Sequence, residues 1–501
     1  MSASGRTLYQ LNTRVHLTAR SRALGRPATL DDIGDAELDR IAAQGFDWVW
    51  LLSVWRTGPA SRAVSLADPG LRREFAATLP DLTDADVGGS GFAIAGYEVS
   101  PALGGEAALA RLRERLAARR LRLMLDFVPN HTGLDHPWAT SRLERYVRGA
   151  ESDLAAAPGN WTTVATADEA QVVVAHGRDP YFPGWTDTLQ LDYGIPDTVE
   201  AMAAELASVA RRCDGVRCDM AMLLLPEVFE RTWGHAALPF WPAAIARARE
   251  AQPGFTLLAE AYWGLEAAML DQGFDLAYDK RLYDRLVAGA AGPVRDHLRA
   301  GADGQARLAR FLENHDEPRA AATFPPDRHR ASALVAFLAP GLRFLHEGQI
   351  EGFRVRVPPQ LVRGPDEPVD GQIARFYGSL LALLRDPLVR EGAWRLLDVA
   401  PAWEGNPTWD GFVAFGWRLG ERRLVVAVNL GATQGQCYVR DPLDGLRDAD
   451  VRLADRLDGR VFNRDADDLA ARGLYVDLPA CGHHVLEATA RPKPRPAAAG
   501  G

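Results

Sequence analysis

Short apolar runs alternate with amphipathic segments along the first 350 residues of the chain. The run at 46–55, FDWVWLLSVW, is long and continuously apolar, as expected for a strand in a sheet buried on both faces. The segment 104–120 places Leu109, Leu112 and Leu116 on one helical face, so it predicts an amphipathic helix. The chain therefore switches repeatedly between strand-like and helix-like patterns.

This alternation yields eight candidate strands with helical segments between most of them. A further helix is expected at 196–212, where Asp197 and Glu200 are spaced like a capping box. Repeated β-then-α order with buried strands favours a parallel sheet, and eight strands favour a closed (β/α)8 TIM barrel. The candidate strands are 8–17, 46–55, 121–128, 213–219, 255–263, 274–279, 306–316 and 341–348.

The barrel pattern is interrupted once and then ends. Residues 129–192 follow the third strand, are rich in Pro, Gly and Trp, and are too long for a simple βα loop, which predicts an excursion domain. Short strands separated by turns predict a C-terminal all-β sandwich at 395–490. Residues 491–501 form a low-complexity tail that we expect to be disordered. The barrel itself is assigned to 1–128 and 193–394.

Composition narrows the class of protein. The chain has 501 residues and a net charge of −9, which disfavours nucleic acid or an anionic membrane as a partner. No apolar run reaches the roughly 18 residues of a membrane span. The N-terminus lacks the apolar segment of a signal peptide, and four cysteines are too few for a disulfide scaffold, so we expect a cytoplasmic protein. The oligomeric state is left open.

Polar and charged residues gather at the carboxyl ends of four predicted strands, where the chemistry of a (β/α)8 barrel lies. Arg217 and Asp219 are two positions apart on one strand, so they point the same way. Asp219 alone could cap a helix and Glu260 alone could form a structural salt bridge. Converging carboxylates are costly unless they are used, so the set favours a functional site. Its members are Asp126, Asn130, His131, Arg217, Asp219, Glu260, Asn314, His315, Asp316 and Arg319.

Four motifs in this order, DFVPNH, GVRCD, AEAYW and ENHD, resemble the four characteristic regions of the α-amylase family, glycoside hydrolase family 13. The segments GLDHPW and GYEV resemble flanking segments of that family, and the resemblance spans roughly residues 8 to 490. It implies a TIM barrel with a terminal β domain and activity on α-linked glucosides.

The resemblance also implies a role for each site residue. Asp219 would be the nucleophile, Glu260 the general acid and then the general base, and Asp316 would bind the sugar hydroxyls and favour a distorted ring. Arg217 would keep Asp219 ionised, because an adjacent cation lowers the pKa of a carboxyl group. Carboxyl groups in these roles should lie about 5–5.5 Å apart, as retaining glycosidases require. The expected sugar-binding side chains are His131, His315 and Tyr97.

The chain departs from the family pattern at two places. Many members carry a Lys-His pair after the nucleophile, where this chain has Met222 and Leu223, so we expect an apolar acceptor side. Calcium-dependent members pair the residue equivalent to Asn130 with an aspartate near the end of the excursion, where this chain has Gln190 in the best register. Calcium prefers charged oxygen ligands, so we expect no metal, although Asp187 or Asp192 could shift into place.

These observations predict a retaining α-glycosidase that acts on short α-linked glucosides through a covalent glycosyl-enzyme on Asp219, without a cofactor. An α-glucosyl transferase or a trehalose-synthase-like isomerase would use the same residues. A non-catalytic sugar-binding homologue is a third reading, although such proteins typically lose one of the carboxylates that Asp219, Glu260 and Asp316 supply. A metal-dependent barrel enzyme using His131 and His315 is a fourth.

Overall fold

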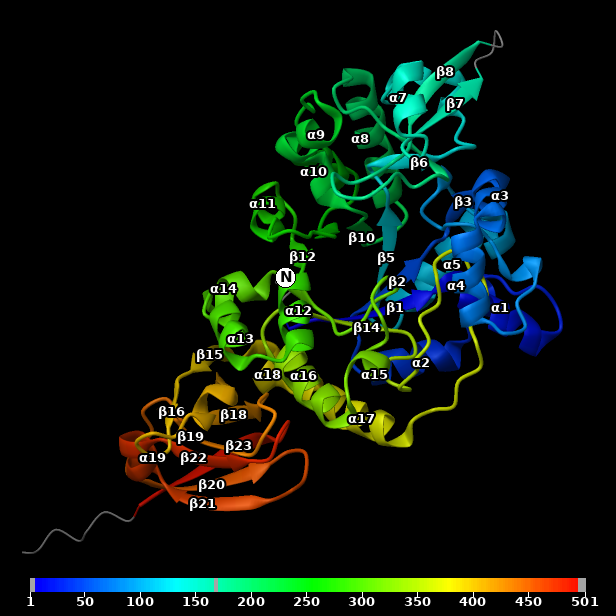
Figure 1. The fold of residues 1–501 in the computed structure, drawn as a ribbon. Helices are drawn as coiled ribbons and strands as arrows, with labels where there is room; N and C mark the ends of the chain where they lie inside the picture. The colour runs from blue at the N-terminus through cyan, green and yellow to red at the C-terminus, as the bar shows by residue number, and fades with distance from the viewer. Residues whose placement is uncertain (1–4, 166–169, 494–501) are drawn as a thin grey trace, which may run out of the picture.

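The computed structural model describes residues 5–165 and 170–493. Eight parallel strands close into a barrel in the order β1-β14-β13-β12-β11-β10-β5-β2, which confirms the predicted fold class (Figure 1). Each strand coincides with one of the apolar runs expected from the sequence. The barrel strands are β1 (Thr7–Asn12), β2 (Trp48–Leu52), β5 (Arg122–Phe127), β10 (Gly215–Cys218), β11 (Thr256–Ala259), β12 (Leu276–Tyr278), β13 (Leu308–Arg310) and β14 (Leu342–His346).

Helices surround the barrel and bury their apolar faces against it. Leu109, Leu112 and Leu116 of α5 are buried together, as their spacing predicts. The larger helices around the barrel are α1 (Thr13–Leu24), α2 (Asp35–Ala43), α5 (Gly105–Ala117), α8 (Pro196–Ala210), α10 (Trp241–Ala251), α12 (Lys280–Ala288), α16 (Pro326–Leu338) and α17 (Gly371–Arg385).

The first expected strand, 8–17, is too long. Strand β1 ends at Asn12, whose side chain accepts a hydrogen bond from the Val15 backbone nitrogen at 3.4 Å and so caps helix α1. After Asn12, Val15 and Leu17 continue the every-second-residue apolar spacing typical of a strand, which hides the boundary between strand and helix from a sequence pattern alone.

The expected capping box at the start of α8 is wrong. The helix begins at Pro196, a residue suited to the first helical position, and no side chain caps it. Asp197 instead pairs with Arg145 at 2.6 Å, and Glu200 pairs with Arg247 at 2.6 Å. Both carboxylates therefore tie α8 to its neighbours.

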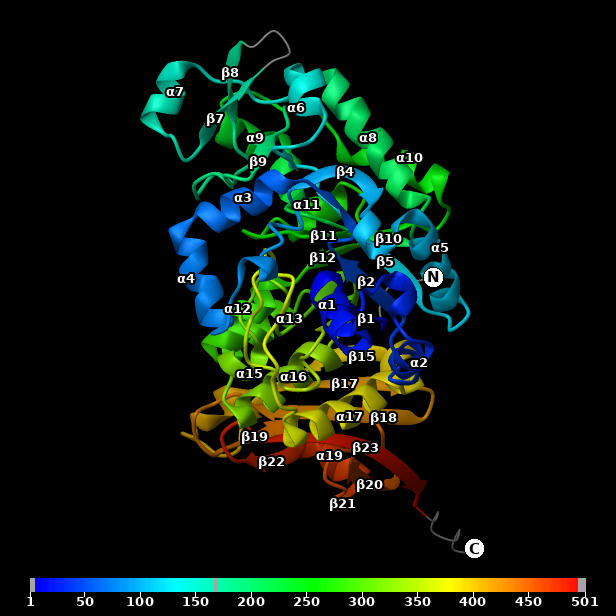
Figure 2. The same ribbon diagram turned by 90° about the vertical axis from the view of Figure 1, so that its right-hand side faces the viewer.

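Two small antiparallel sheets lie between β5 and α8. Strand β6 (His131–Gly133) pairs with β9 (Thr188–Gln190), and β7 (Trp161–Ala165) pairs with β8 (Gln171–Ala175). Figure 2 shows β7 and β8 at one end of the barrel and the C-terminal sheets at the opposite end. The excursion thus projects from the end of the barrel at which β5 finishes.

The C-terminal part of the chain forms two antiparallel sheets with a common core, as predicted. Strand β23 runs to Pro492, so the first two residues of the expected tail are strand, and 494–501 lie outside the described residues. The strands are β15 (Ala393–Leu397), β16 (Val399–Pro401), β17 (Phe412–Leu419), β18 (Arg422–Asn429), β19 (Gly435–Val439), β20 (Ala449–Asp455), β21 (Val461–Asp465), β22 (Leu474–Leu478) and β23 (His483–Pro492).

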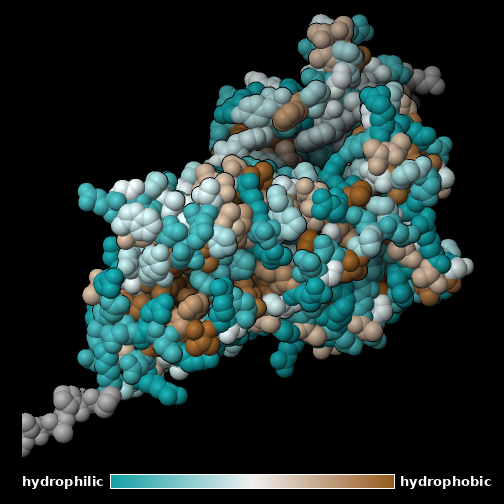
Figure 3. All heavy atoms as spheres, turned by 60° about the horizontal axis from the view of Figure 1, so that its bottom comes forward, coloured by the Kyte–Doolittle hydropathy of each residue, from teal (hydrophilic) through white to brown (hydrophobic). Residues whose placement is uncertain are grey.

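The face of the molecule drawn in Figure 3 is mainly hydrophilic, and its hydrophobic atoms occur in small groups. Among the described residues, no helix has the length and apolar character needed to cross a membrane.

Candidate active site

Arg217 lies at the centre of the site. Its side chain is fully buried, and its guanidinium contacts Asp219 Oδ1 through Nη1 and Glu260 Oε2 through Nη2, the latter at 2.7 Å. Its Nε donates a hydrogen bond to the Tyr278 hydroxyl at 3.3 Å. One guanidinium therefore joins the two carboxylates expected to act as nucleophile and acid, and it holds them at the ends of neighbouring strands β10 and β11.

Glu260 follows β11 and is buried beside other acidic groups. Its Oε2 accepts a hydrogen bond from the Met220 backbone nitrogen at 2.6 Å, and its Oε1 accepts one from the Tyr262 hydroxyl at 2.7 Å. Burial raises the pKa of Glu260 to about 7, with Arg217 opposing the rise and the nearby carboxylates of Asp219 and Asp316 adding to it. The carboxyl group is therefore partly protonated near neutral pH.

Asp219 and Asp316 occupy the same cavity as Glu260. The Asp219 backbone nitrogen donates to Phe127 O at 2.8 Å, which continues the β10–β5 pairing to the nucleophile position. Asp316 is the most exposed of the three, with 43% of its side chain accessible. A shared cavity of about 310 Å³ is lined by Ser90, Phe92, His131, Trp185, Asp187, Thr188, Asp219, Met220, Glu260, Tyr262, Asp316, Pro359 and Gln360.

His315 lies beside Asp316 as a neutral ring. Its Nδ1 is hydrogen-bonded to the Gln10 side-chain amide at 2.9 Å, and its Nε2 lies 3.0 Å from Asp316 Oδ2 without forming a hydrogen bond among the described residues. Burial lowers the pKa of His315 to about 4, so the ring is neutral at pH 7. The ring packs against Trp50 and Phe92 with centroids 5.7 and 5.3 Å away.

The excursion contributes His131 and Trp185 to the cavity. Their ring centroids are 5.1 Å apart, and His131 Nδ1 is buried without a hydrogen-bond partner among the described residues. Trp138 and Trp161 have structural contacts instead, because Trp138 packs under the Arg145 guanidinium at 4.3 Å and Trp161 packs against Trp233. The excursion contains three tryptophans, and Trp185 is the one that lines the cavity.

Two other strand-end residues have structural contacts outside the cavity. Asp126 is buried and accepts hydrogen bonds from Trp50 Nε1 at 2.9 Å and from the Ser53 backbone nitrogen at 2.6 Å. Arg319 pairs with the buried Glu313 at 2.6 Å. Position at a strand end alone therefore does not distinguish these residues from the three carboxylates.

The expectation that Tyr97 stacks on the sugar is wrong. Tyr97 is 8% exposed, its hydroxyl donates to Val128 O and accepts from Val128 N, both at 2.9 Å, and its ring packs on Phe127. Phe92, five residues earlier, is the aromatic residue of this segment that lines the cavity. The motif GYEV marks the correct segment, but it carries no signal for which aromatic ring turns inward.

The expectation that Met222 and Leu223 form the acceptor side is also wrong. They belong to a short 3-10 turn, Ala221–Leu224, and are 0% and 3% exposed within the hydrophobic core. Met220 precedes the turn with a left-handed φ of 41° and faces the cavity. The turn directs the two expected residues inward.

Asn130 and Gln190, the positions compared above with calcium ligands of the family, are hydrogen-bonded to each other. Gln190 Nε2 donates to Asn130 Oδ1 at 3.0 Å and to Asn130 O at 2.9 Å, while Asn130 Nδ2 donates to Gln190 Oε1 at 3.0 Å. Both side chains are buried and their amides satisfy each other. Among residues 5–165 and 170–493, no group of three His, Cys, Asp or Glu side chains is arranged to hold a metal ion. These two residues therefore do not fit a hard divalent cation.

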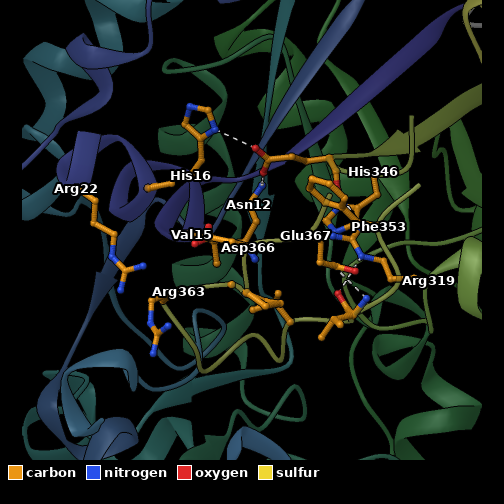
Figure 4. A pocket seen from close by; sticks show the side chains of 16 residues that line it. Asn12, Val15, His16, Arg22, Arg319, His346, Phe353, Arg363, Asp366 and Glu367 are labelled. Carbon is orange, nitrogen blue, oxygen red and sulfur yellow. Dashed lines mark hydrogen bonds and ion pairs between the residues drawn. The ribbon is translucent and has the colours of Figure 1, made fainter. Parts of the chain in front are cut away.

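A separate cavity of about 450 Å³ lies between α1 and the segment that follows β14 (Figure 4). His16 lines this cavity, and its Nδ1 lies 2.9 Å from Glu347 and its Nε2 3.3 Å from Glu37. These two carboxylates raise the pKa of His16 to about 10 despite its burial. The segment after β14 lines this cavity with Val355 and Val357, and it lines the carboxylate cavity with Pro359 and Gln360.

Comparison with known proteins points to one family. The family model "Alpha amylase, catalytic domain" matches residues 33–160. The α-amylase MalA of Haloarcula japonica is 23% identical over 365 residues, which cover 71% of this chain and 45% of that protein. The matched part thus spans less than half the length of this relative. These findings confirm the resemblance that the four motifs predict.

Solved structures with the same fold cover nearly the whole chain. The maltogenic α-amylase AmyB of Thermotoga neapolitana has a TM-score of 0.69 at 16% identity, covering 96% of this chain and 98% of its own. The α-amylase of Geobacillus thermoleovorans, solved with acarbose, has a TM-score of 0.66 at 19% identity, covering 97% and 98%. Other similar structures include a debranching enzyme and an α-glucosyl transfer enzyme. The fold is thus shared by glycosidases and glucosyl transferases.

Proposed function

We propose that this chain, a member of the α-amylase family, is a retaining α-glycosidase that cleaves short α-linked glucosides. Asp219 attacks the anomeric carbon and forms a covalent glycosyl-enzyme, while Glu260 protonates the departing oxygen. In the second step Glu260 removes a proton from water, and the water oxygen displaces Asp219. Asp316 binds the sugar hydroxyls, and the side chains of this chain supply every group the reaction needs without a cofactor.

The observation that carries this proposal is the contact of one buried guanidinium with both Asp219 and Glu260. A nucleophilic carboxylate has to be ionised, and the contact with Arg217 favours the charged form. An acid has to be protonated, and burial raises the pKa of Glu260 to about 7. A carboxyl group with a raised pKa beside a second carboxylate in one cavity suits the division of labour in a retaining glycosidase.

His131 and His315 support a sugar in the same cavity. His315 Nε2 and His131 Nδ1 are both buried ring nitrogens without a hydrogen-bond partner among the described residues. Phe92 and Trp185 add aromatic surface that suits the apolar face of a sugar ring. Arg217 is proposed to orient the nucleophile, whereas Tyr97 is assigned a structural role.

The test combines a nucleophile variant with analysis of stereochemistry. Wild-type protein is incubated with α-linked glucosides, among them maltose, sucrose, trehalose and 4-nitrophenyl α-glucoside, and the first-formed anomer is followed by NMR. We expect the α anomer first and a loss of at least a thousandfold in Asp219→Asn, because removal of the nucleophile abolishes the covalent route. A β first product, or Asp219→Asn activity within tenfold of wild type, would contradict the proposal.

A glucosyl transferase or isomerase remains a second candidate on one specific observation. A larger cavity, of about 700 Å³, adjoins the carboxylate cavity beside Glu260 and provides room for an acceptor other than water. Both reactions share the first step and differ in which hydroxyl attacks the glycosyl-enzyme. Product analysis with and without added acceptor separates them, because transfer consumes donor without releasing an equal amount of free glucose.

A further inference from the structure

A cavity of about 700 Å³ begins where the leaving group would depart. Met220 and Tyr262 line both this cavity and the carboxylate cavity, and these are the residues that donate hydrogen bonds to Glu260. The cavity therefore opens beside the two residues that hold Glu260, while Glu260 itself lines the adjoining carboxylate cavity. We call the larger one the acceptor cavity. Its lining residues are Asp179, Phe182, Met220, Tyr262, Trp263, Gly264, Glu266, Lys280, Arg281 and Asp284.

Exposed aromatic side chains gather at the acceptor cavity. Phe182 is 66% exposed and Trp263 is 41% exposed, and Tyr181, next to Phe182, packs edge-on against Trp263 with centroids 4.9 Å apart. Phe182 and Tyr181 belong to the excursion, whereas Trp263 follows β11. Two separate parts of the chain thus bring large apolar surface to one place in water, which marks a binding surface.

The backbone is strained at two of the lining residues. Trp263 has φ 59° and Met220 has φ 41°, both in the left-handed region that disfavours residues other than glycine. Gly264 follows Trp263 and is also left-handed, with φ 78°, so the turn after β11 directs the indole away from the core. Strain at a residue whose ring lies exposed beside a cavity points to a role for that ring.

Most charged groups in the acceptor cavity are already paired. Lys280 Nζ lies 2.5 Å from Asp284 and 3.1 Å from Glu317. Asp179 accepts hydrogen bonds from the backbone nitrogens of Tyr181 and Phe182 at 2.7 and 3.0 Å, which fixes the turn that carries the exposed rings. The cavity therefore combines these paired charges, and those of Glu266 and Arg281, with the apolar surface of Phe182, Met220, Tyr262 and Trp263.

We propose that the acceptor cavity selects an aromatic acceptor, a phenol or aryl alcohol, whose ring lies against Trp263 and Phe182. This inference rests on the proposed function and names the molecule that competes with water in its second step. The acceptor hydroxyl oxygen attacks the anomeric carbon, Glu260 takes the hydroxyl proton, and the bond from that carbon to Asp219 breaks to release the carboxylate. The product is an aryl or arylalkyl α-glucoside.

The experiment uses α-glucosyl fluoride as donor and compares three acceptors at equal concentration: benzyl alcohol, cyclohexylmethanol and glucose. Fluoride release reports formation of the glycosyl-enzyme, and the ratio of transfer product to free glucose reports the acceptor step. Cyclohexylmethanol matches benzyl alcohol in size without an aromatic face. We expect a transfer ratio about five- to tenfold higher with benzyl alcohol than with either other acceptor, the size expected for one good aromatic contact.

The variants Trp263→Ala and Phe182→Ala test the assignment to residues. Each variant should lower the ratio of transfer product to free glucose at least fivefold with benzyl alcohol, at equal amounts of fluoride released. The same ratio with glucose as acceptor should stay nearly unchanged. Trp403→Ala is the matched control, because Trp403 is 55% exposed but follows β16 in the C-terminal part of the chain. Preference for glucose, or an equal loss for all three acceptors, would overturn the proposal.

A binding measurement keeps the proposal testable if no turnover occurs. Asp219→Asn is titrated with phenyl α-glucoside and methyl α-glucoside, and tryptophan fluorescence reports binding. Phenyl α-glucoside should bind about tenfold more tightly, and the advantage should disappear when Trp263→Ala is added. Absence of fluoride release by wild type would refute the proposed function, whereas equal binding of the two glucosides would refute the aromatic acceptor cavity.

Discussion

Replacing Glu260 by Gln should separate substrates by how much proton assistance their leaving groups need. The pKa of Glu260 is raised from 4.5 to about 7, so about half of the carboxyl groups are protonated at pH 7. An unperturbed glutamic acid is almost entirely ionised at that pH, so burial enriches the protonated form that a general acid requires.

The structure also indicates what glutamine would lose in addition. Glu260 accepts hydrogen bonds from Met220 N and Tyr262 and contacts Arg217. A glutamine has one acceptor oxygen, so its amide nitrogen would face a donor, at a cost of roughly 1–3 kcal/mol for the unsatisfied groups. This cost applies to every substrate, whereas loss of the proton applies to substrates with poor leaving groups.

The assay is kcat/KM for maltose and for α-glucosyl fluoride, because this ratio reports steps up to formation of the glycosyl-enzyme. We expect Glu260→Gln to lose at least a hundredfold on maltose and less than about tenfold on the fluoride, whose leaving group needs little proton assistance. For wild type, kcat/KM on maltose should fall about tenfold per pH unit above pH 7, since the rate requires protonated Glu260. This decline of kcat/KM above pH 7 should be absent in Glu260→Gln.

Glu227→Gln is the control, because Glu227 is an exposed residue in the first turn of α9 (Pro226–Trp233). It should match wild type on both substrates. The reasoning would be refuted if Glu260→Gln lost equally on maltose and on the fluoride, or if it kept the same decline above pH 7.

Three further outcomes follow from the contacts described above. Gln190→Ala should destabilise the fold by about 2–4 kcal/mol, because it leaves the buried Asn130 amide unpaired. The melting temperature of wild type should be nearly the same in EDTA and in calcium, and a large fall in EDTA would contradict this. Tyr97→Leu should destabilise the fold by about 2–4 kcal/mol with little change in kcat/KM, because the ring is buried and its hydroxyl pairs with Val128, whereas Phe92→Ala should lower kcat/KM at least tenfold; the reverse pattern would restore the stacking role to Tyr97. Maltose should have a higher kcat/KM than soluble starch counted per reducing end, and a starch preference above tenfold would rule out short substrates.

The barrel could be predicted because its strands are continuous apolar runs, and burial on both faces leaves such runs few alternatives. Boundaries were harder to predict. Val15 and Leu17 keep the alternating spacing of a strand although the chain turns into a helix after Asn12. The three carboxylates could be predicted because each lies in a motif that resembles the α-amylase family, whereas position at a strand end also selects Asp126 and Arg319, which have structural contacts elsewhere.

The parts of the site that could not be predicted depend on how irregular segments turn. Met220 adopts a left-handed φ, and the short turn after it buries Met222 and Leu223, which no alternation of residue types reveals. Tyr97 and Phe92 are both aromatic and near in sequence, so only the fold shows which ring reaches the cavity. The acceptor cavity likewise requires two distant segments to meet.

The shared contact of Arg217 with Asp219 and Glu260 couples the protonation of Glu260 to the charge of Asp219 in the proposed reaction. The charge of Asp219 contributes to the raised pKa of Glu260. When Asp219 becomes an ester that charge disappears, and the full attraction of Arg217 falls on Glu260, so its pKa drops and it releases its proton readily. Glu260 therefore acts as a base once the bond to Asp219 has formed. Its pKa rises again when hydrolysis of the ester restores the charge of Asp219. The order of the two half-reactions then depends on the charge of Arg217 and requires no conformational change.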